Sequence, residues 1–557
     1  MHLISLADGV FVSGQISPDD IPEIAALGVK TIVCNRPDGE DAQQPLSQSI
    51  LNAAEQAGIA YIYMPVVSGS VSDADAAAFG EAISTSDGSV LAFCRSGMRS
   101  TTLWALSQAT QRCTNTILEQ VSRAGFDLTP LKARLLSSQK LSMAIEKIFD
   151  IVIVGAGAAG LAACASLLKR RHNLQICIID PAEQHFYQPG WTMVGAGVFT
   201  PEITCRRMAS LIPESVSWVR SAASAFEPLN NRVLLSSGES VQYRALVVAP
   251  GLKLDWSAIP GLEESLGENG VTSNYRFDLA PYTWELVQQL RDGKALFTQP
   301  PMPIKCAGAP QKAMYLSADH WCRYGMKNRI QFHTAGNVLF GVPDYVPALM
   351  DYIERYGVDL RLGSTLTAID GRNRTASFVH TGANGSRTTE NVEFDMIHVC
   401  PPQTAPDFIK ASPLASESGW VEVDQNTLRH VRFENVFGLG DATTTPNAKT
   451  AAAARKQAPV LAQNVLSFLD GRPLLAAYDG YGSCPLTVER GKIVLAEFCY
   501  GGKLAPTFPT WLLDGRKPSR LAWHLKSEAL PSLYWHAMLK GREWLCAPET
   551  LKKPVSA

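Results

Sequence analysis

The sequence predicts an α/β protein of several domains, in which parallel strands alternate with helices. Its 557 residues are too many for one hydrophobic core. Apolar runs of strand length alternate with Gly-rich turns and helical stretches over most of the chain. A glycine fingerprint also joins one such strand to a helix, in "DIVIVGAGAAGLAACAS". Together these observations indicate nucleotide-binding α/β domains with further segments on both sides.

Changes of pattern along the chain predict the domain organisation. Residues 1–138 form a predicted small α/β domain, with buried strands at "KTIVCNRP" and "VLAFC". Residues 139–148 carry charge and are a predicted linker. The predicted nucleotide-binding domain comprises residues 149–270 and 391–470. A second Rossmann-like domain comprises residues 271–390, and a C-terminal region rich in Trp, Leu and basic residues comprises residues 471–557.

Composition excludes several classes of function. The net charge of −2 gives no reason to expect nucleic acid binding. No basic segment with a long apolar run opens the chain, and no stretch approaches the roughly 20 apolar residues of a membrane span. The 12 cysteines lack zinc-site spacing, so we predict no metal site and expect reduced thiols, with Cys164 and Cys177 in the core.

The glycine fingerprint predicts a dinucleotide site. Gly155, Gly157 and Gly160 lie between an apolar strand and a helix, where glycine lets the backbone approach a pyrophosphate. Asp180 ends the next strand at the distance expected of an acid that holds a ribose hydroxyl. The strand, turn, helix, second strand and acid occur in the required order.

Two later segments favour FAD over NAD as the bound cofactor. "ALVVAPG", which ends at Gly251, resembles the strand and turn that return to the first nucleotide domain in two-domain flavoproteins. The segment "NVFGLGDATTTPNAKTAAAARKQ" resembles their second FAD motif and contributes Gly440, Asp441 and Lys449. The Ala-rich helix after it would direct its N-terminus toward the isoalloxazine and stabilise negative charge there.

A second nucleotide fingerprint is missing where NADH-using relatives of this fold carry one. The strand "KALFTQ" is followed by "PPMPIKCAGAPQK", whose prolines lack N–H groups that could cradle phosphate. Cys306 lies where the phosphate-binding loop would be, which makes it a candidate reactive thiol. The alternative interpretation is an ordinary Pro-rich loop with a passive cysteine. Its candidate partner is Cys484, which we expect in the Gly/Pro turn of "YDGYGSCPLTVERGK". Their proximity does not follow from the sequence alone.

From about residue 148 to its end, the chain resembles the sulfide:quinone oxidoreductases shared by bacteria and mitochondria. The matching stretches are "QPGWTMVGAG", "PIKCAGAPQK", "GLGDATTTPNAKTAAA", "YDGYGSCPL" and "LPSLYWHAMLKG". The resemblance implies that Cys306 and Cys484 form the redox pair on one face of FAD. Hydrosulfide would attack a disulfide or trisulfide bridge between them; Cys306 would face the flavin and Cys484 would keep the transferable sulfur.

Two further residues are candidates for the same chemistry. Lys312 follows Cys306 closely in sequence and would stabilise the sulfur anions, although a solvated lysine is an equal alternative. Glu264 matches a position proposed for proton transfer in relatives.

The C-terminal region is predicted to meet a membrane. Aromatic and basic residues flank apolar ones in this region, as they do in helices that lie in a membrane interface. The tryptophans are Trp511, Trp523, Trp535 and Trp544. The alternative is a helical pair that closes the core. The resemblance favours the membrane, because quinone is reached from the bilayer. Phe498 and Phe508 would then stack near the quinone, and Lys526 would aid its protonation.

The N-terminal domain carries a predicted anion-binding loop in "VLAFCRSGMRSTTLWAL". Loop N–H groups would converge on the sulfur of Cys94, with Arg95 and Arg99 lowering its pKa. Four residues separate Cys94 from Arg99, which is a rhodanese-like length and shorter than the loop of tyrosine phosphatases. The unit resembles a phosphatase-fold sulfurtransferase family often fused to sulfide-oxidising enzymes.

The combined hypothesis is an FAD enzyme that oxidises hydrogen sulfide to the persulfide level. Electrons would pass to ubiquinone or another membrane quinone, and Cys94 would transfer sulfane sulfur, with glutathione or sulfite as acceptors. We expect the protein to attach peripherally to the cytoplasmic face of a bacterial inner membrane. A homodimer is possible, but the sequence does not determine the oligomeric state. The alternative is an NAD(P)H-dependent FAD oxidoreductase with a tyrosine phosphatase-like regulatory domain, which requires the missing glycine fingerprint.

Overall fold

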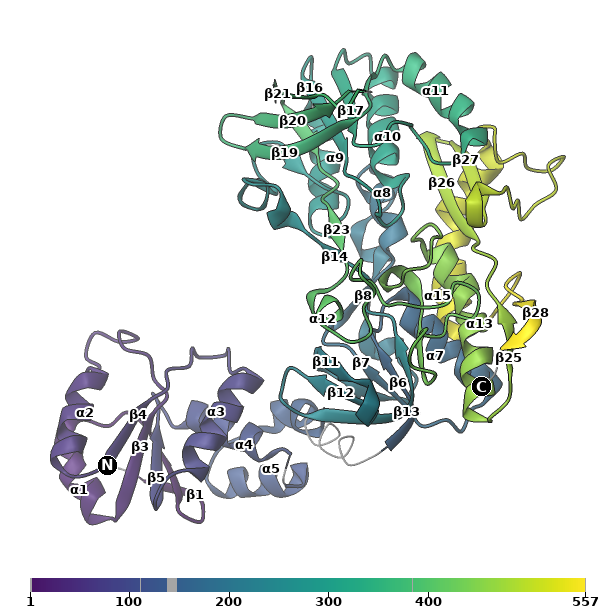
Figure 1. Cartoon of the computed structure of the whole chain (residues 1–557). Coiled ribbons are helices and arrows are strands. Elements are labelled where there is room, and N and C mark those ends of the chain that lie inside the picture. Colours follow the sequence, from purple (N-terminus) through teal and green to yellow (C-terminus); the bar gives the residue numbers. More distant parts are fainter. Residues whose placement is uncertain (1–2, 111, 138–147, 383, 556–557) are drawn as a thin grey trace. The chain divides into compact units, whose positions relative to one another are not determined.

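The computed structural model describes residues 3–110, 112–137, 148–382 and 384–555. The chain forms two compact units, Met1–Lys147 and Ile148–Ala557 (Figure 1). The predicted linker at 139–148 lies outside the described residues except for residue 148.

The first unit is a five-stranded sheet covered by helices on both faces. Its strand order is β1-β2-β5-β3-β4, parallel except for the β1–β2 pair. One face packs on α1 and α2, and the other on α3, α4 and α5. The bounds are β1 Ile4–Ala7, β2 Val10–Ser13, β3 Val29–Cys34, β4 Ala60–Tyr63, β5 Ser89–Phe93, α1 Ile21–Ala26, α2 Ser47–Gln56, α3 Asp73–Ser84, α4 Met98–Gln108 and α5 Thr114–Arg123. Because both faces are covered, the central strands β3 and β5 are mostly apolar and buried.

The second unit begins with a seven-stranded sheet in the order β10-β7-β6-β13-β12-β11, with β24 also pairing with β13. The strands β10, β7, β6, β13 and β24 run parallel. Helices α7 and α13 pack on this sheet in one apolar cluster. The bounds are β6 Ile148–Val154, β7 Ile176–Ile179, β10 Ser217–Val219, β11 Ala223–Glu227, β12 Arg232–Leu235, β13 Ser240–Val248, β24 Val436–Gly438, α7 Ala158–Arg170 and α13 Ala451–Leu469.

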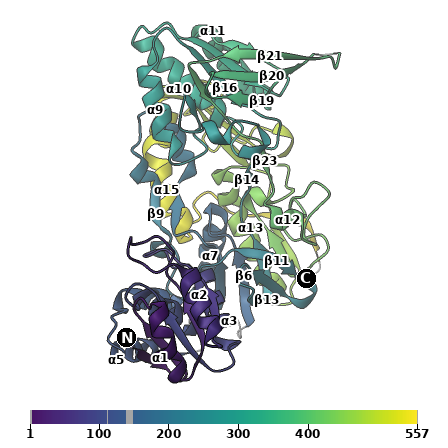
Figure 2. The same ribbon diagram turned by 90° about the vertical axis from the view of Figure 1, so that its left-hand side faces the viewer.

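A second parallel sheet has the order β15-β22-β16-β17-β18. Helices α10 and α11 pack on one face, and part of the antiparallel sheet β19-β20-β21 packs on the other (Figure 2). The bounds are β15 Val271–Thr272, β16 Lys294–Gln299, β17 Arg329–Thr334, β18 Asp359–Arg361, β19 Ser364–Asp370, β20 Thr375–Thr381, β21 Arg387–Glu393, β22 Met396–His398, α9 Leu279–Gln289, α10 Ala309–Arg323 and α11 Val346–Arg355.

The C-terminal region differs from its predicted helical form. Strand β25 (Leu474–Ala477) pairs with β28 (Glu549–Val555), and β26 (Gly482–Glu489) forms a hairpin with β27 (Lys492–Phe498). Among the described residues of this region, only Arg520–His536 forms an extended helical run: α14 (Arg520–His524), a π-helical turn (Leu525–Ala529) and α15 (Leu530–His536). In the part of the chain that the structure describes, no helix is long and apolar enough to cross a membrane.

The hairpin corrects the expectation for Cys484, which lies in strand β26 and not in a turn. The turn lies farther on, between β26 and β27, where Gly491 adopts a φ of +101° that favours glycine. Pro485 is tolerated inside the strand because β26 pairs with only one neighbour, so its other edge needs no N–H donor.

Candidate functional site

The loop between β6 and α7 has the backbone shape of a nucleotide cradle. Gly155 has a φ of +99°, and a Cβ on it would lie 2.4 Å from Ala249 O. A Cβ on Gly160 would lie 1.8 Å from Gly155 O, so a side chain at either position would clash with backbone. Nothing lies within 4 Å of a Cβ built on Gly157, which leaves open space beside the start of α7. These residues therefore fit the pyrophosphate of FAD.

The predicted ribose-binding acid is part of this loop's support. Asp180 follows β7, and its Oδ2 accepts a hydrogen bond from the Ala156 N–H over 2.6 Å. Its Oδ1 accepts one from the Ala182 N–H over 2.8 Å. Gly251 follows β13 with a φ of +76°, and nothing lies within 4 Å of a Cβ built on it.

The second FAD motif follows β24, which pairs with β13, and it reaches the same loop. A Cβ on Gly440 would lie 2.7 Å from the Cβ of Ala159 in α7. Burial raises the pKa of the neighbouring Asp441 carboxyl. Burial also lowers the pKa of Lys449 to about 8, although the Asp441 charge opposes that shift. The Lys449 ammonium donates to the carbonyls of Asp441 and Thr443 over 2.7 and 2.9 Å, which fixes the turn before α13.

Two thiols far apart in sequence meet beside this cradle. The Sγ atoms of Cys306 and Cys484 lie 3.7 Å apart. Cys306 lies in the Pro-rich loop before α10, in the left-handed region with a φ of +50°, and its N–H donates to Lys449 O over 2.8 Å. A Cβ on Gly308 would lie 2.5 Å from Cys484 Sγ, so this glycine lets β26 approach the loop. The loop therefore links the thiol pair directly to the second FAD motif.

Positive charge surrounds the pair. The Nζ of Lys312 lies 3.1 Å from Cys306 Sγ, and only 2% of the lysine is exposed. A hydrogen bond from Cys484 and the Lys312 charge outweigh burial and lower the pKa of Cys306. Burial opposes the charge on Lys312, but the two sulfurs outweigh it and raise the lysine's pKa. Cys306 is therefore the more acidic thiol of the pair.

A second buried ammonium faces the same thiols. Lys526, on the π-helical turn, is 2% exposed and donates to Pro189 O over 2.8 Å. Burial lowers the pKa of Lys526 to about 7, and the Lys312 charge adds to this effect, while the charges of both thiols oppose it. The structure thus places Lys526 within electrostatic reach of the sulfur atoms.

Sequence reasoning missed a half-buried polar group next to Cys306. The Nζ of Lys305 donates to Gln188 Oε1 over 2.6 Å and lies 5.7 Å from the ring centroids of both Trp191 and Tyr275. A third thiol, Cys400, packs in the same cluster as Tyr275. The signal was present, because Lys305 precedes Cys306 and Gln188 lies in "QPGWTMVGAG", but only the fold brings the two segments together.

Other candidates lie away from the thiol pair or apart from one another. Glu264 is exposed, and among the described residues no hydrogen bond or ion pair joins it to the thiols. Phe498 ends β27 and packs edge-on against Phe340, with ring centroids 6.1 Å apart. Phe508 packs in a different apolar cluster, against Leu513. The two aromatic residues proposed for quinone, Phe498 and Phe508, therefore pack in different apolar clusters.

In the first unit, Cys94 follows β5 directly and is buried. The N–H of Gly97, which caps α4, donates to Cys94 Sγ over 3.2 Å. Arg99 is also buried, but its guanidinium pairs with Glu40 over 2.9 Å. Arg95 is exposed. The loop therefore supplies a backbone donor to the sulfur, while the Arg99 charge is already paired with a carboxylate.

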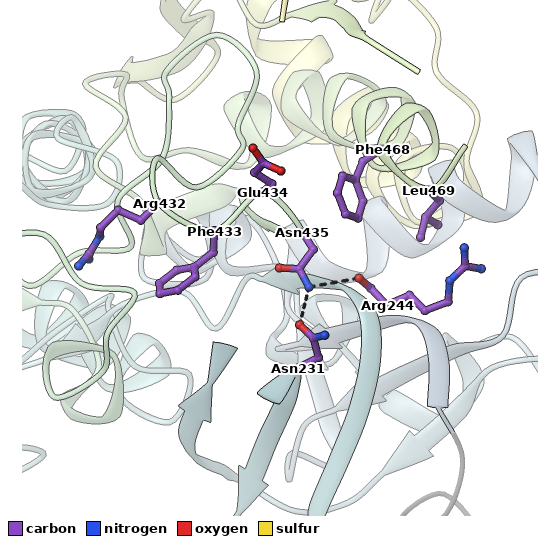
Figure 3. Close-up of a pocket in the computed structure, with 8 residues that line it drawn as sticks. All are labelled: Asn231, Arg244, Arg432, Phe433, Glu434, Asn435, Phe468 and Leu469. Atoms are coloured by element: carbon purple, nitrogen blue, oxygen red, sulfur yellow. Dashed lines mark hydrogen bonds between the residues drawn. The ribbon is translucent and has the colours of Figure 1, made fainter. Parts of the chain in front are cut away.

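A surface hollow of about 690 Å³ lies elsewhere on the second unit (Figure 3). The Asn435 amide spans it and donates to Asn231 Oδ1 over 2.7 Å and to Arg244 O over 3.3 Å. Its lining contains no cysteine and none of the candidate site residues: Asn231, Arg244, Arg432, Phe433, Glu434, Asn435, Phe468 and Leu469. We therefore assign the chemistry to the thiol site.

A nucleotide cradle, a second FAD motif and a partly buried thiol pair define a flavoprotein of the two-nucleotide-domain class. Residues 149–458 match the family described as pyridine nucleotide-disulphide oxidoreductase, and residues 2–111 match the phosphatase-like domain of the beta-lactamase hydrolase-like protein. FAD is the cofactor of this class.

Comparison with whole proteins narrows the class. The chain is 40% identical to the mitochondrial sulfide:quinone oxidoreductase of Dictyostelium discoideum, over 76% of this chain and 93% of that protein. It is 37% identical to the mitochondrial enzyme of Mus musculus, over 71% of this chain and 87% of that protein. The chain belongs to the sulfide:quinone oxidoreductase family. The solved enzyme of Aquifex aeolicus shares the fold, with a TM-score of 0.60 at 19% identity over 73% of this chain and 98% of that one.

Proposed function

We propose that this protein oxidises sulfide to persulfide sulfur with FAD and passes two electrons to a membrane quinone. The observation that carries the proposal is the 3.7 Å approach of Cys306 and Cys484 beside Lys312, next to the FAD cradle. A partly buried thiol pair with a lowered pKa on one sulfur suits nucleophilic sulfur exchange. The nicotinamide route of the alternative hypothesis lacks support, because the Pro-rich loop holds a thiol where its glycine fingerprint would lie.

The first half-reaction is sulfur exchange at the pair. Hydrosulfide attacks Cys484 in the oxidised bridge, forming a persulfide there and releasing Cys306 as a thiolate; the sulfur–sulfur bond of the bridge breaks as the new one forms. Lys312, 3.1 Å from Cys306 Sγ, stabilises that thiolate. Lys526 offers a second ammonium nearby, and with a pKa of about 7 it exchanges protons near neutrality.

The second half-reaction restores the pair. A thiol acceptor takes the outer sulfur of the Cys484 persulfide. The Sγ atoms of Cys306 and Cys484 then form the disulfide bond again and give up two electrons. FAD, when bound, takes those two electrons and delivers them to quinone. In sum, sulfide, a thiol and quinone become a persulfide and quinol, which balances both atoms and electrons. Gly155, Gly157, Gly160, Asp441 and Lys449 would hold the cofactor.

Contact with the membrane is proposed for the C-terminal region. Large apolar side chains are exposed there, including Trp511 at 84% and Leu512 at 49%. Such residues suit peripheral attachment to a bilayer from which quinone is drawn. We propose Phe498 and Phe508 as quinone contacts, and the cytoplasmic face of a bacterial inner membrane as the location.

For the first unit we propose sulfur transfer through a Cys94 persulfide. The Gly97 N–H lies where it would stabilise an anionic sulfur on Cys94. Because Arg99 is paired with Glu40, the loop offers less free positive charge than a phosphate dianion needs. Incubation with thiosulfate or glutathione persulfide should therefore leave a persulfide on Cys94, detected by mass spectrometry and absent in Cys94→Ala. Hydrolysis of an aryl phosphate that is lost in Cys94→Ala would instead support a phosphatase.

The test of the main proposal is anaerobic mixing of the intact enzyme with sulfide. The flavin absorbance should bleach and return when ubiquinone is added, whereas NADH should leave it unchanged. Cys306→Ser and Cys484→Ser should each abolish the bleaching. The matched control is Cys322→Ser, since that cysteine is exposed on α10. Flavin that does not respond to sulfide in the intact enzyme would reject the proposal.

A further inference from the structure

A buried histidine connects the nucleotide loop to the C-terminal helix. The Nδ1 of His185, in β8 (Gln184–Phe186), lies 3.0 Å from Ala156 O in the loop. Its Nε2 lies 2.6 Å from the hydroxyl of Tyr534 in α15. The two side chains are each 3% exposed. A chain of two hydrogen bonds therefore runs from the C-terminal region to the backbone of the FAD cradle.

The partners fix which atom donates in each bond. A carbonyl can only accept, so Nδ1 of His185 carries the proton that faces Ala156 O. Burial lowers the pKa of His185 to about 4, so the ring is neutral at physiological pH and Nε2 has a free lone pair. The Tyr534 hydroxyl therefore donates to Nε2 and holds the ring in the tautomer that the loop requires.

The geometry of the peptide bond gives this chain a consequence for the cofactor. In a trans peptide the carbonyl and the following N–H point in opposite directions. Holding Ala156 O on the His185 side therefore directs the Gly157 N–H, at the start of α7, away from His185. Asp180 holds the Ala156 N–H, so both peptide groups that flank Ala156 are fixed.

Packing around Tyr534 restricts its movement. Its ring lies 4.8 Å from that of Tyr187 and 5.0 Å from that of Trp535. The Arg206 guanidinium covers the Trp535 ring at 4.4 Å. These contacts place α15 against the segment that also contains His185, and the ribbons of α15 and α7 lie near one another in both views (Figures 1 and 2).

A second anchor is Glu543, seven residues beyond the end of α15. Glu543 accepts hydrogen bonds from Ser166 over 2.5 Å and from Arg170 over 2.6 Å, both on α7, the helix whose N-terminus faces the cradle. Gly541 allows this approach, since a Cβ on it would lie 2.7 Å from Ala165 O. The segment from Leu530 to Cys546 therefore holds both the loop and its helix.

We propose that the segment 530–546 is a working part of the FAD site, in which Tyr534 acts through His185 as a positioning residue for the pyrophosphate-binding loop. Neither side chain needs to touch the cofactor. The same helical run carries Lys526 beside the thiols and Tyr534 beside the loop, so one element of the C-terminal region supports both halves of the active site.

The test measures FAD binding by the full-length apoprotein, followed by flavin fluorescence. Tyr534→Phe removes only the hydroxyl, and loss of one buried hydrogen bond should weaken FAD binding about five- to tenfold. His185→Phe should weaken it at least as much. The matched control is Tyr478→Phe, which removes another buried tyrosine hydroxyl, bonded to Tyr481 O, in the same apolar cluster. It should leave FAD affinity within about twofold while lowering the free energy of unfolding similarly.

The double variant separates this role from a general loss of stability. Because both residues act through one chain of bonds, His185→Phe with Tyr534→Phe should bind FAD about as weakly as His185→Phe alone. An FAD affinity of Tyr534→Phe within about twofold of the wild type would overturn the proposal. So would a double variant whose loss equals the product of the two single losses. If His185→Phe does not fold, the rate of FAD release from the Tyr534→Phe holoenzyme, compared with that of Tyr478→Phe, decides the matter.

Discussion

Replacing Lys312 with methionine isolates the electrostatic contribution to the thiol site. Methionine keeps the length and apolar stem of the lysine but removes the ammonium that lies 3.1 Å from Cys306 Sγ. A hydrogen bond to a charged group contributes about 1.5–3 kcal/mol, and one pKa unit corresponds to about 1.4 kcal/mol. Without its charged partner the thiolate is less stable, so the pKa of Cys306 should rise by about 1–2 units.

The long-wavelength charge-transfer absorbance between thiolate and flavin reports this pKa. We would titrate the reduced thiol pair of the FAD-loaded enzyme with pH and compare the midpoints of the wild type and Lys312→Met. The control is Lys503→Met, which removes an exposed lysine and should leave the midpoint unchanged. A Lys312→Met midpoint equal to that of the wild type would show that this ammonium does not stabilise the thiolate, and the proposed role of Lys312 would fail.

Two further predictions concern Lys526 and the cradle. Burial lowers the pKa of Lys526 to about 7, below about 10.4 in an unfolded chain, so between these values the unfolded state binds more protons and stability should rise with pH. In urea unfolding from pH 7 to 9, the free energy of unfolding of Lys526→Met should rise less steeply with pH than that of the wild type. An unchanged pH dependence would contradict the lowered pKa of Lys526. Gly160→Ala should purify without FAD, judged by flavin absorbance per protein, because its Cβ would lie 1.8 Å from Gly155 O. Gly341→Ala, with nothing within 4 Å of its Cβ, should retain FAD, and retention by both variants would refute the steric argument.

The cofactor loop was predictable because its determinants are local. Gly155 and Gly160 are required by contacts within a strand–turn–helix unit, and these requirements are visible as spacing in the sequence. The alternation of buried strands and helices likewise follows from nearby residues. The strand that carries Cys484 was not recognised, because Gly482 and Pro485 are typical of turns and its pairing with β27 was overlooked.

The sequence by itself determined an α/β flavoprotein with a nucleotide loop, a thiol in place of a second nucleotide fingerprint, and a candidate partner thiol. Only the tertiary structure decided that Cys306 and Cys484, 178 residues apart, lie 3.7 Å from one another, and that Lys526 and Tyr534 reach back to the same site. The physical reason is that a glycine turn is specified by sterics over a few residues. A pair of adjacent thiols, or a tyrosine that fixes a histidine tautomer, exists only after distant segments have packed together.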